Sequence, residues 1–155
     1  GYTYRDKDNL FRNIIIRNRL QNLFLEAYDK MQRFSTQFRQ HRNNEISTRQ
    51  SELRRRFIAL VKAHCTHERS VSFYADKLCI STRYLAAIVR ITTNESVKSI
   101  IDRAVILEIK NLLQSTDLSV QEIAYELHFP DQSYLGRYFK KHTGQSPSAF
   151  RNSRK

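Results

Sequence analysis

An internal repeat in the C-terminal part of the chain most constrains the fold. The first repeated residues return 49 positions later: Ser70, Val71, Ala75 and Leu78 return as Ser119, Val120, Ala124 and Leu127. The next ones return 50 positions later: Tyr84, Leu85, Thr93 and Ser96 return as Tyr134, Leu135, Thr143 and Ser146. One inserted residue in the second copy accounts for the change of offset. The repeat predicts two copies of one small unit.

Each copy has the pattern of a helix-turn-helix unit. A serine N-cap opens a helix of about two turns, which has alanine in its middle and leucine at its end, and a short turn leads to a longer helix. Ala75 and Ala124 are small enough to let the two helices of a copy cross closely. The longer helices should end at residues that tolerate positive φ and are followed by new serine N-caps. These residues are Asn94 with Ser96 and Gly144 with Ser146.

Between the copies, residues 97–115 form one amphipathic stretch, and the periodicity is helical almost throughout the chain. The inner side of this stretch contains Val97, Ile101, Ala104, Val105 and Leu112. A helix of this length spans about 28 Å, close to the ~34 Å of one DNA turn. The sequence therefore predicts an all-α fold in which a linker helix joins two helix-turn-helix subdomains.

A long N-terminal helix is predicted over residues 10–38 by a heptad pattern. One seam position holds Leu10, Arg17, Phe24, Met31 and Phe38, and the other holds Asn13, Leu20, Ala27 and Phe34. Phenylalanines and a charged Arg17 are poor coiled-coil residues, so two interpretations stay open. The helix either pairs with a second copy of the chain or docks its apolar stripe on another domain.

The polar segment 40–50 is predicted to be a linker. Ser47 and Gln50 have the spacing of a capping box that opens a new helix, and Phe57, Leu60 and Val61 give this helix one apolar face that ends near residues 64–66. We therefore expect a helical dimerisation or interdomain segment at residues 1–45 and a DNA-binding domain at residues 46–155. The chain begins with Gly1 rather than Met, which suggests that it is part of a longer protein.

The charge balance favours a polyanionic partner. The chain has 27 Lys and Arg against 15 Asp and Glu, a net charge of +12, and no acidic residue follows Arg137. Such a surface attracts nucleic acid. The 3 glycines are too few and too scattered for a phosphate-binding loop of the Walker or dinucleotide type.

The remaining composition does not favour an enzyme, a metal site or a membrane protein. Cys65 and Cys79 make no disulfide framework and no Cys-x-x-Cys motif, and His64 and His67 lack a second ligand pair. Cys79, next to Leu78, is expected in the core rather than as a nucleophile. No apolar run is long enough to span a membrane, and residues 1–8 lack the apolar h-region of a signal peptide, so we expect a cytoplasmic protein in a reducing compartment, with no cofactor and no metal.

The residues of the second copy resemble the C-terminal signature of the AraC family of bacterial transcription regulators. The resemblance covers about residues 51–151 and is strongest over the stretch Ser119-Val-Gln-Glu-Ile-Ala-Tyr-Glu-Leu-His-Phe-Pro-Asp-Gln-Ser-Tyr-Leu-Gly-Arg-Tyr-Phe-Lys-Lys-His-Thr-Gly-Gln-Ser-Pro-Ser-Ala-Phe-Arg151. The first copy matches more loosely over residues 75–85. The resemblance implies sequence-specific binding of a bipartite site on double-stranded DNA and regulation of transcription. Such proteins commonly carry an N-terminal sensor domain, and the resemblance implies that residues 1–45 are the end of such a region, with the sensor itself outside this sequence.

The family's base-reading positions fall in the longer helix of each copy. In the second copy they are Gln132, Ser133, Gly136 and Arg137. Arg137 has the donors for guanine O6 and N7, and Gln132 has the groups that pair with adenine, each contact discriminating by about 1–3 kcal/mol. A phosphate contact or a salt bridge is the alternative role for Arg137. Gly136 is costly within a helix and is interpreted as a site of close approach to the groove.

In the first copy the corresponding positions are Arg83, Tyr84, Ala86 and Ala87. The two alanines depart from the family's long polar side chains, although they could pack against a thymine methyl group. Arg83 is then the main polar reader, and the first copy should be less sequence-selective. Aromatic packing explains at least one of Tyr84 and Tyr134 better than base stacking.

Phosphate contacts are expected from residues flanking these helices, which are Ser81, Thr82, Arg90, Lys140 and Lys141. Further candidate partners are RNA polymerase and a second copy of the chain through residues 10–38. The alternative function is a helical interaction module that binds protein and associates with DNA only non-specifically. An enzyme with a cysteine nucleophile is the third and least favoured interpretation.

Overall fold

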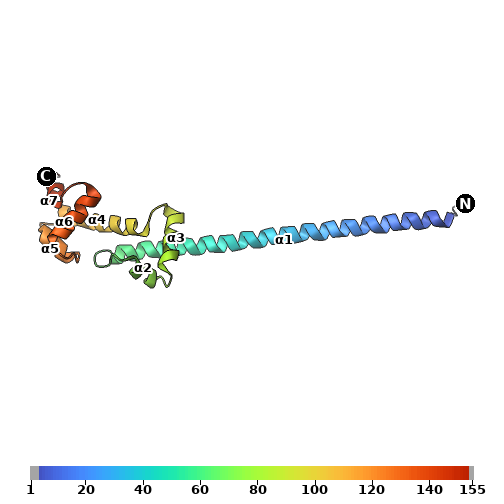
Figure 1. Cartoon of the computed structure of the whole chain (residues 1–155), viewed down its shortest axis with the longest axis horizontal. Helices are drawn as coiled ribbons and strands as arrows, with labels where there is room; N and C mark the ends of the chain where they lie inside the picture. Colours follow the sequence, from blue (N-terminus) through green and yellow to red (C-terminus); the bar gives the residue numbers. More distant parts are fainter. Residues whose placement is uncertain (1–3, 154–155) are drawn as a thin grey trace. The chain divides into compact units, whose positions relative to one another are not determined.

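The structure is a computed structural model that describes residues 4–153, with side chains from residue 11 onwards. Seven helices and no strand occur within this range, which confirms the all-α prediction (Figure 1). They are α1 (Tyr4–His64), α2 (Val71–Lys77), α3 (Thr82–Thr93), α4 (Val97–Ser115), α5 (Val120–Glu126), α6 (Gln132–Thr143) and α7 (Pro147–Asn152).

Helix α1 runs without interruption through the segment that was predicted to be a polar linker. The prediction of a linker at 40–50 with a helix start at Ser47 is therefore wrong. Residues 4–64 contain neither proline nor glycine, so nothing in the backbone breaks the helix. The polar side chains pair along it instead: His41 Nε2 lies 3.3 Å from Glu45 Oε1, and Thr48 Oγ1 donates to the Asn44 carbonyl. The end of α1 at His64 agrees with the prediction.

The chain divides into two compact parts, residues 1–48 and residues 49–155. Within residues 1–48 every described side chain is exposed, including Phe24 at 74% and Phe34 at 71%. Phe34 and Phe38 stack on each other at 6.5 Å between ring centroids. Of the predicted seam residues, Leu10 lies outside the described side chains.

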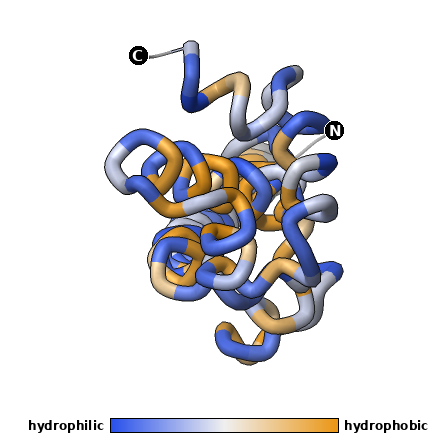
Figure 2. The backbone as a smooth tube through the Cα atoms, turned by 90° about the vertical axis from the view of Figure 1, so that its left-hand side faces the viewer, coloured by the Kyte–Doolittle hydropathy of each residue, from blue (hydrophilic) through white to orange (hydrophobic). Residues whose placement is uncertain are grey.

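Residues 49–155 contain the hydrophobic core, and α4 contributes buried residues to it from Val97 to Leu113. Figure 2 shows hydrophobic and hydrophilic residues alternating along the helical turns, as in amphipathic helices. Ile101, Val105 and Ile109 on α4 are each 1% exposed or less. Around this helix pack the last turns of α1 with α2 and α3, and α5 with α6 and α7. The predicted inner side of the linker helix is confirmed, with Ala104 and Leu112 only partly buried.

The turn inside each helix-turn-helix unit has the same hydrogen-bond pattern. In the first copy Ile80 N–H donates to the Ala75 carbonyl and Cys79 N–H to the Asp76 carbonyl. Phe129 and His128 make the equivalent bonds in the second copy, to Ala124 and Tyr125. These are the paired bonds of a Schellman motif, which needs a left-handed residue just after the helix end. That residue is Cys79 at φ 56° in one copy and His128 at φ 55° in the other.

The expectation that Cys79 packs in the core is consequently wrong, because its side chain is exposed. A left-handed residue at the end of a Schellman motif directs its side chain away from the helix pair, and Ile80 takes the inward position instead. Cys65, at the end of α1, is the buried cysteine, and burial raises the pKa of its thiol.

The predicted caps are confirmed in both copies. Ser70 and Ser119 accept hydrogen bonds from the first turns of α2 and α5. Asn94 and Gly144 end α3 and α6 with φ of 57° and 83°. Ala75 and Ala124, at the two helix crossings, are 1% and 2% exposed. The two helix-turn-helix units therefore have matching left-handed residues in the inner turn and at the end of the longer helix.

Tyr74 should make the stability of the fold fall with pH in the alkaline range. Its hydroxyl donates to the Glu68 carbonyl at 2.6 Å, and burial raises its pKa from 10.0 to about 12. Above pH 10 the unfolded state releases this proton while the folded state retains it, so stability is lost as pH rises towards 12. We expect Tyr74→Phe to cost about 1 kcal/mol at neutral pH and to show a smaller further loss at high pH.

The measurement is denaturant unfolding of both proteins at one pH below 10 and one between 10 and 12. Tyr125→Phe is the matched control, since Tyr125 is 82% exposed. An identical pH dependence in the wild type and Tyr74→Phe would contradict this role for Tyr74.

Candidate nucleic-acid interface

The longer helices of the two copies, α3 and α6, present equivalent exposed faces. Each has 12 residues, and their first residues, Thr82 and Gln132, lie 50 positions apart. In α6 the residues at 133, 136, 137, 140 and 141 have the spacing of one helix face, opposite buried Leu135 and Phe139. In α3 the corresponding face contains residues 83, 86, 87 and 90, opposite buried Leu85 and Val89.

The predicted base-reading side chains of α6 lie on its exposed side. Gln132, Ser133 and Arg137 are exposed, and Gly136 is half-buried. The Arg137 guanidinium lies 6.0 Å from the centroid of the Tyr134 ring, at the limit of a cation–π contact. Within the described part of the chain no salt bridge neutralises Arg137, and its side chain is exposed to solvent. The helix thus presents donors outward along one stripe.

The start of α6 is fixed by an acidic cap. Asp131 Oδ1 accepts a hydrogen bond of 2.7 Å from Tyr134 N–H. The Tyr134 ring leans on Phe129, with ring centroids 6.0 Å apart, which agrees with the prediction that packing explains at least one of the two equivalent tyrosines. Tyr134 therefore helps to seat the first turn of the helix.

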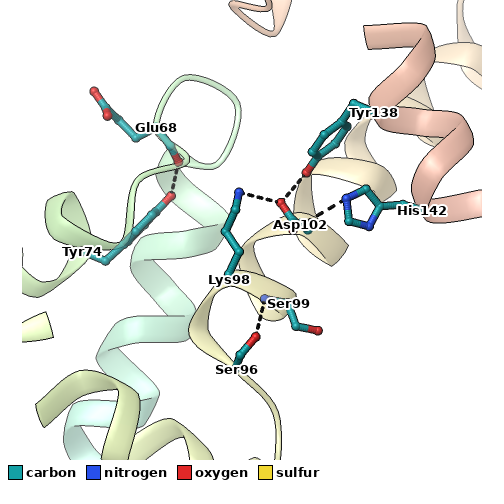
Figure 3. Close-up of polar contacts among 8 residues, drawn as sticks. All are labelled: Glu68, Tyr74, Ser96, Lys98, Ser99, Asp102, Tyr138 and His142. Atoms are coloured by element: carbon teal, nitrogen blue, oxygen red, sulfur yellow. Dashed lines mark hydrogen bonds and ion pairs between the residues drawn. The ribbon is translucent and has the colours of Figure 1, made fainter. Parts of the chain in front are cut away.

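The back of α6 is held by Asp102 of α4, a contact that the sequence did not reveal (Figure 3). Asp102 is 8% exposed, and Tyr138 Oη donates to its Oδ1 at 2.7 Å. Lys98 Nζ donates to the same oxygen at 3.0 Å, and His142 Nε2 lies 3.7 Å from Oδ2. Burial and the bond to Asp102 raise the pKa of Tyr138, so the phenol stays a donor. A carboxylate placed 36 residues from its partner has no signature in the sequence.

Helix α3 is simpler. Arg83, Tyr84, Ala86 and Ala87 are all exposed, and no described aromatic ring packs on Tyr84. The equal starts of the two helices make Arg83 equivalent to Ser133 and Ala87 equivalent to Arg137. The predicted correspondence is therefore wrong by one residue at its start, because Gln132 is equivalent to Thr82 and Tyr84 is equivalent to Tyr134. Where the second copy presents an arginine in its second turn, the first copy presents a methyl group.

The predicted phosphate contacts lie at the ends of these helices. Ser81 is the N-cap of α3, and its Oγ accepts a hydrogen bond from Tyr84 N–H at 3.1 Å, which leaves the hydroxyl hydrogen available to donate. Thr82 is exposed in the first turn of α3. Arg90, Lys140 and Lys141 are exposed in last turns, where a cation also stabilises the helix dipole.

No close contact within the protein requires a glycine at position 136. A Cβ atom added there would meet nothing within 4 Å, and the residue lies within regular helix rather than at a positive φ. A glycine in such a place costs about 1 kcal/mol against alanine. Its presence on the exposed face is therefore not explained by folding.

Comparison with known proteins places this arrangement in a family. A family model described as "Helix-turn-helix domain" matches residues 74–153, just over half of the chain. The chain belongs to the AraC family of helix-turn-helix proteins. The matched residues contain the second helix-turn-helix unit complete and the first from within α2.

Two regulators are similar to this AraC-family chain. The Msm operon regulatory protein of Streptococcus mutans is 37% identical over 81 residues, which are 52% of this chain and 29% of that protein. The arabinose operon regulatory protein of Escherichia coli K12 is 35% identical over 81 residues, 52% of this chain and 28% of that protein. The matched region thus spans less than a third of either relative.

Solved structures have the same fold. The C-terminal domain of AraT, a response regulator from Geobacillus stearothermophilus, has a TM-score of 0.61 at 25% identity and covers 65% of this chain and 84% of that chain. The DNA-binding domain of the global transcriptional factor AdpA, solved with a target DNA, has a TM-score of 0.57 at 25% identity and covers 63% of this chain and 87% of that chain.

Within the described residues, no helix is both long and apolar enough to cross a membrane. The same part of the chain contains no group of three His, Cys, Asp or Glu residues that could hold a metal ion.

Proposed function

We propose that this chain is the DNA-binding part of a transcription regulator, which reads two successive major-groove segments with α3 and α6. The observation that carries the proposal is the equivalence of these helices: the same length, matching caps and one exposed face each, on a strongly basic chain. The structure of the AdpA domain with its target DNA supports it. A bacterial DNA partner would keep the protein in the cytoplasm.

The two helices are assigned different tasks. Gln132, Ser133, Gly136 and Arg137 of α6 read base edges, with Arg137 on guanine and Gln132 on adenine. Arg83, Tyr84 and Ala87 read in α3, where Arg83 is the polar donor. The phosphate contacts of Ser81, Thr82, Arg90, Lys140 and Lys141 hold the register. The hydrogen bond from Tyr138 of α6 to the buried Asp102 supports the assignment of the stronger base discrimination to this helix.

The test is selection of bound duplexes from a random DNA pool near physiological salt, followed by binding of point-substituted sites. We expect two blocks about one helical turn apart, with the sharper block assigned to α6. Arg137→Ala should lower discrimination at one guanine by about 1–3 kcal/mol, and Arg83→Ala should lower discrimination less. Equal losses in the two variants would contradict the difference between the copies.

The alternative function, a protein-interaction module with non-specific DNA affinity, gives another result. No motif would emerge, and binding would simply fade with salt at a logarithmic slope near −0.9 per phosphate neutralised. The exposed apolar stripe of α1 is the observation that favours this alternative.

Gly136→Ala should separate stability from binding. The substitution removes the helix penalty of glycine, so we expect the free energy of unfolding to rise by up to about 1 kcal/mol. The added methyl group projects from the reading face, so affinity for the selected site should fall. Both are measured on the same preparation, by denaturant unfolding and by DNA titration. Unchanged or tighter DNA binding would contradict close approach of the α6 backbone to DNA.

We further propose that RNA polymerase contacts the regulator on DNA.

We also propose that residues 10–38 pair with a second copy of the chain. The heptad seam contains Phe24, Met31, Phe34 and Phe38, each more than 60% exposed, and an exposed apolar surface of this kind marks an interaction site. We expect the mass measured by sedimentation to rise with protein concentration. Met31→Glu should give a lower mass than the wild type at the same concentration. Leu25→Glu is the matched control outside the seam. A concentration-independent monomer mass would contradict self-pairing.

A further inference from the structure

We propose that Arg69 is a positioning residue that locks the second helix-turn-helix unit onto the first and thereby sets the spacing between DNA blocks that the protein accepts. The role in spacing rests on the proposed function, whereas the lock itself is a property of the free protein. Arg69 lies in the loop between α1 and α2, outside both exposed reading faces.

The side chain bridges two parts of the chain that are far apart in sequence. Arg69 Nη1 donates to the Leu127 carbonyl and Nη2 to the His128 carbonyl, each at 2.8 Å. These carbonyls belong to the turn between α5 and α6. They follow the last residue of a helix, where backbone acceptors have no intrahelical partner, and a cation at a helix C-terminus is favoured by the dipole. The fork of donors therefore fixes both the position and the direction of this turn.

Two ring contacts reinforce the same junction. The Arg69 guanidinium lies 4.2 Å from the centroid of the Phe129 ring, well within the range of a cation–π contact. The rings of His67 and His128 lie 5.2 Å apart, edge to face. These two contacts thus hold His128, the left-handed residue of the turn between α5 and α6, and Phe129, which follows it.

The loop that carries Arg69 is itself fixed to the first unit. Tyr74, 0% exposed, donates its hydroxyl to the Glu68 carbonyl at 2.6 Å (Figure 3). Ser70, the next residue after Arg69, is the N-cap of α2, and Cys65 at the other end of the loop is 2% exposed. A movement of the second turn relative to Arg69 is therefore a movement of the second unit relative to the first.

The geometry matters for DNA because the separation of two binding blocks is strict. One base pair of extra spacing moves a block by about 3.4 Å along the duplex and about 34° around it. Helix α4 joins the two helix-turn-helix units through apolar packing, and its Asp102 also holds α6 through the hydrogen bond from Tyr138. The paired hydrogen bonds of Arg69 add a second directional contact, which comes from the loop before the first unit, so the angle between α3 and α6 is fixed by two connections rather than one.

A distance measurement on the free protein tests the lock. Cys79, in the turn of the first helix-turn-helix unit, is exposed, and Cys65 is buried with a raised thiol pKa, so a spin label attaches to Cys79. Gln121→Cys, at an exposed position of α5, takes the second label. We expect a narrow distribution of label distances in the otherwise wild-type protein and a broader one after Arg69→Gln. Arg69→Lys, which keeps the charge without the paired donors, should also broaden it and serves if Arg69→Gln folds poorly.

The matched control is Arg54→Gln, which removes one exposed positive charge from α1 and should leave the distribution narrow. An unchanged distribution in Arg69→Gln and Arg69→Lys would overturn the lock.

A second experiment tests the consequence for DNA. The selected site is rebuilt with one base pair added to or removed from its spacer. The wild type should lose about tenfold or more in affinity with each change, whereas Arg69→Gln should bind the native spacing more weakly but lose less than about threefold. A loss by the same factor at every spacing, as expected of Arg54→Gln, would overturn the role in spacing. If the wild type selects no site while the label distances still broaden, the proposed function fails and the lock stands.

Discussion

Burial of α4 is the interaction on which the rest of this structure depends. The short helices α2 and α5 have 7 residues each, fewer than an isolated helix needs to be stable in water. Neither helix-turn-helix unit could bury enough apolar surface alone. Helix α4 offers both of them one continuous apolar surface, from Val97 to Leu113. The positions of the two reading helices therefore follow from how each packs on this one element.

Apolar packing keeps each reading helix against the core, but a helix that reads bases must also be held at a defined angle to the DNA. Two polar anchors, the buried Asp102 and the half-buried Arg69, supply orientation in the second helix-turn-helix unit. Asp102 receives Tyr138 from the back of α6, and Arg69 holds the carbonyls just before that helix. Because hydrogen bonds to charged groups are directional and strong, they restrict rotation that aliphatic contacts would allow. The first unit has its reading helix capped by Ser81 and packed through Leu85, Ile88 and Val89, without a comparable buried carboxylate.

Local features of the fold were predictable from the sequence because they depend on neighbouring residues. The repeat, the serine caps, the left-handed Asn94 and Gly144 and the bounds of α4 all follow from short-range rules. Two predictions failed for physical reasons: the polar segment 40–50 stays helical because nothing breaks it, and Cys79 is exposed because the turn geometry directs it outward. Asp102 and Arg69 meet partners 36 to 59 residues away, and periodicity carries no information about such pairs.

The most direct test of the account is a guanine-methylation footprint of the protein on its selected duplex. We expect two protected major-groove segments about one helical turn apart on one face of the DNA, and we expect Arg137→Ala to lose the protection of the guanine that Arg137 reads. Protection of a single segment, or an even decrease of methylation along the duplex, would contradict reading by two coupled helices.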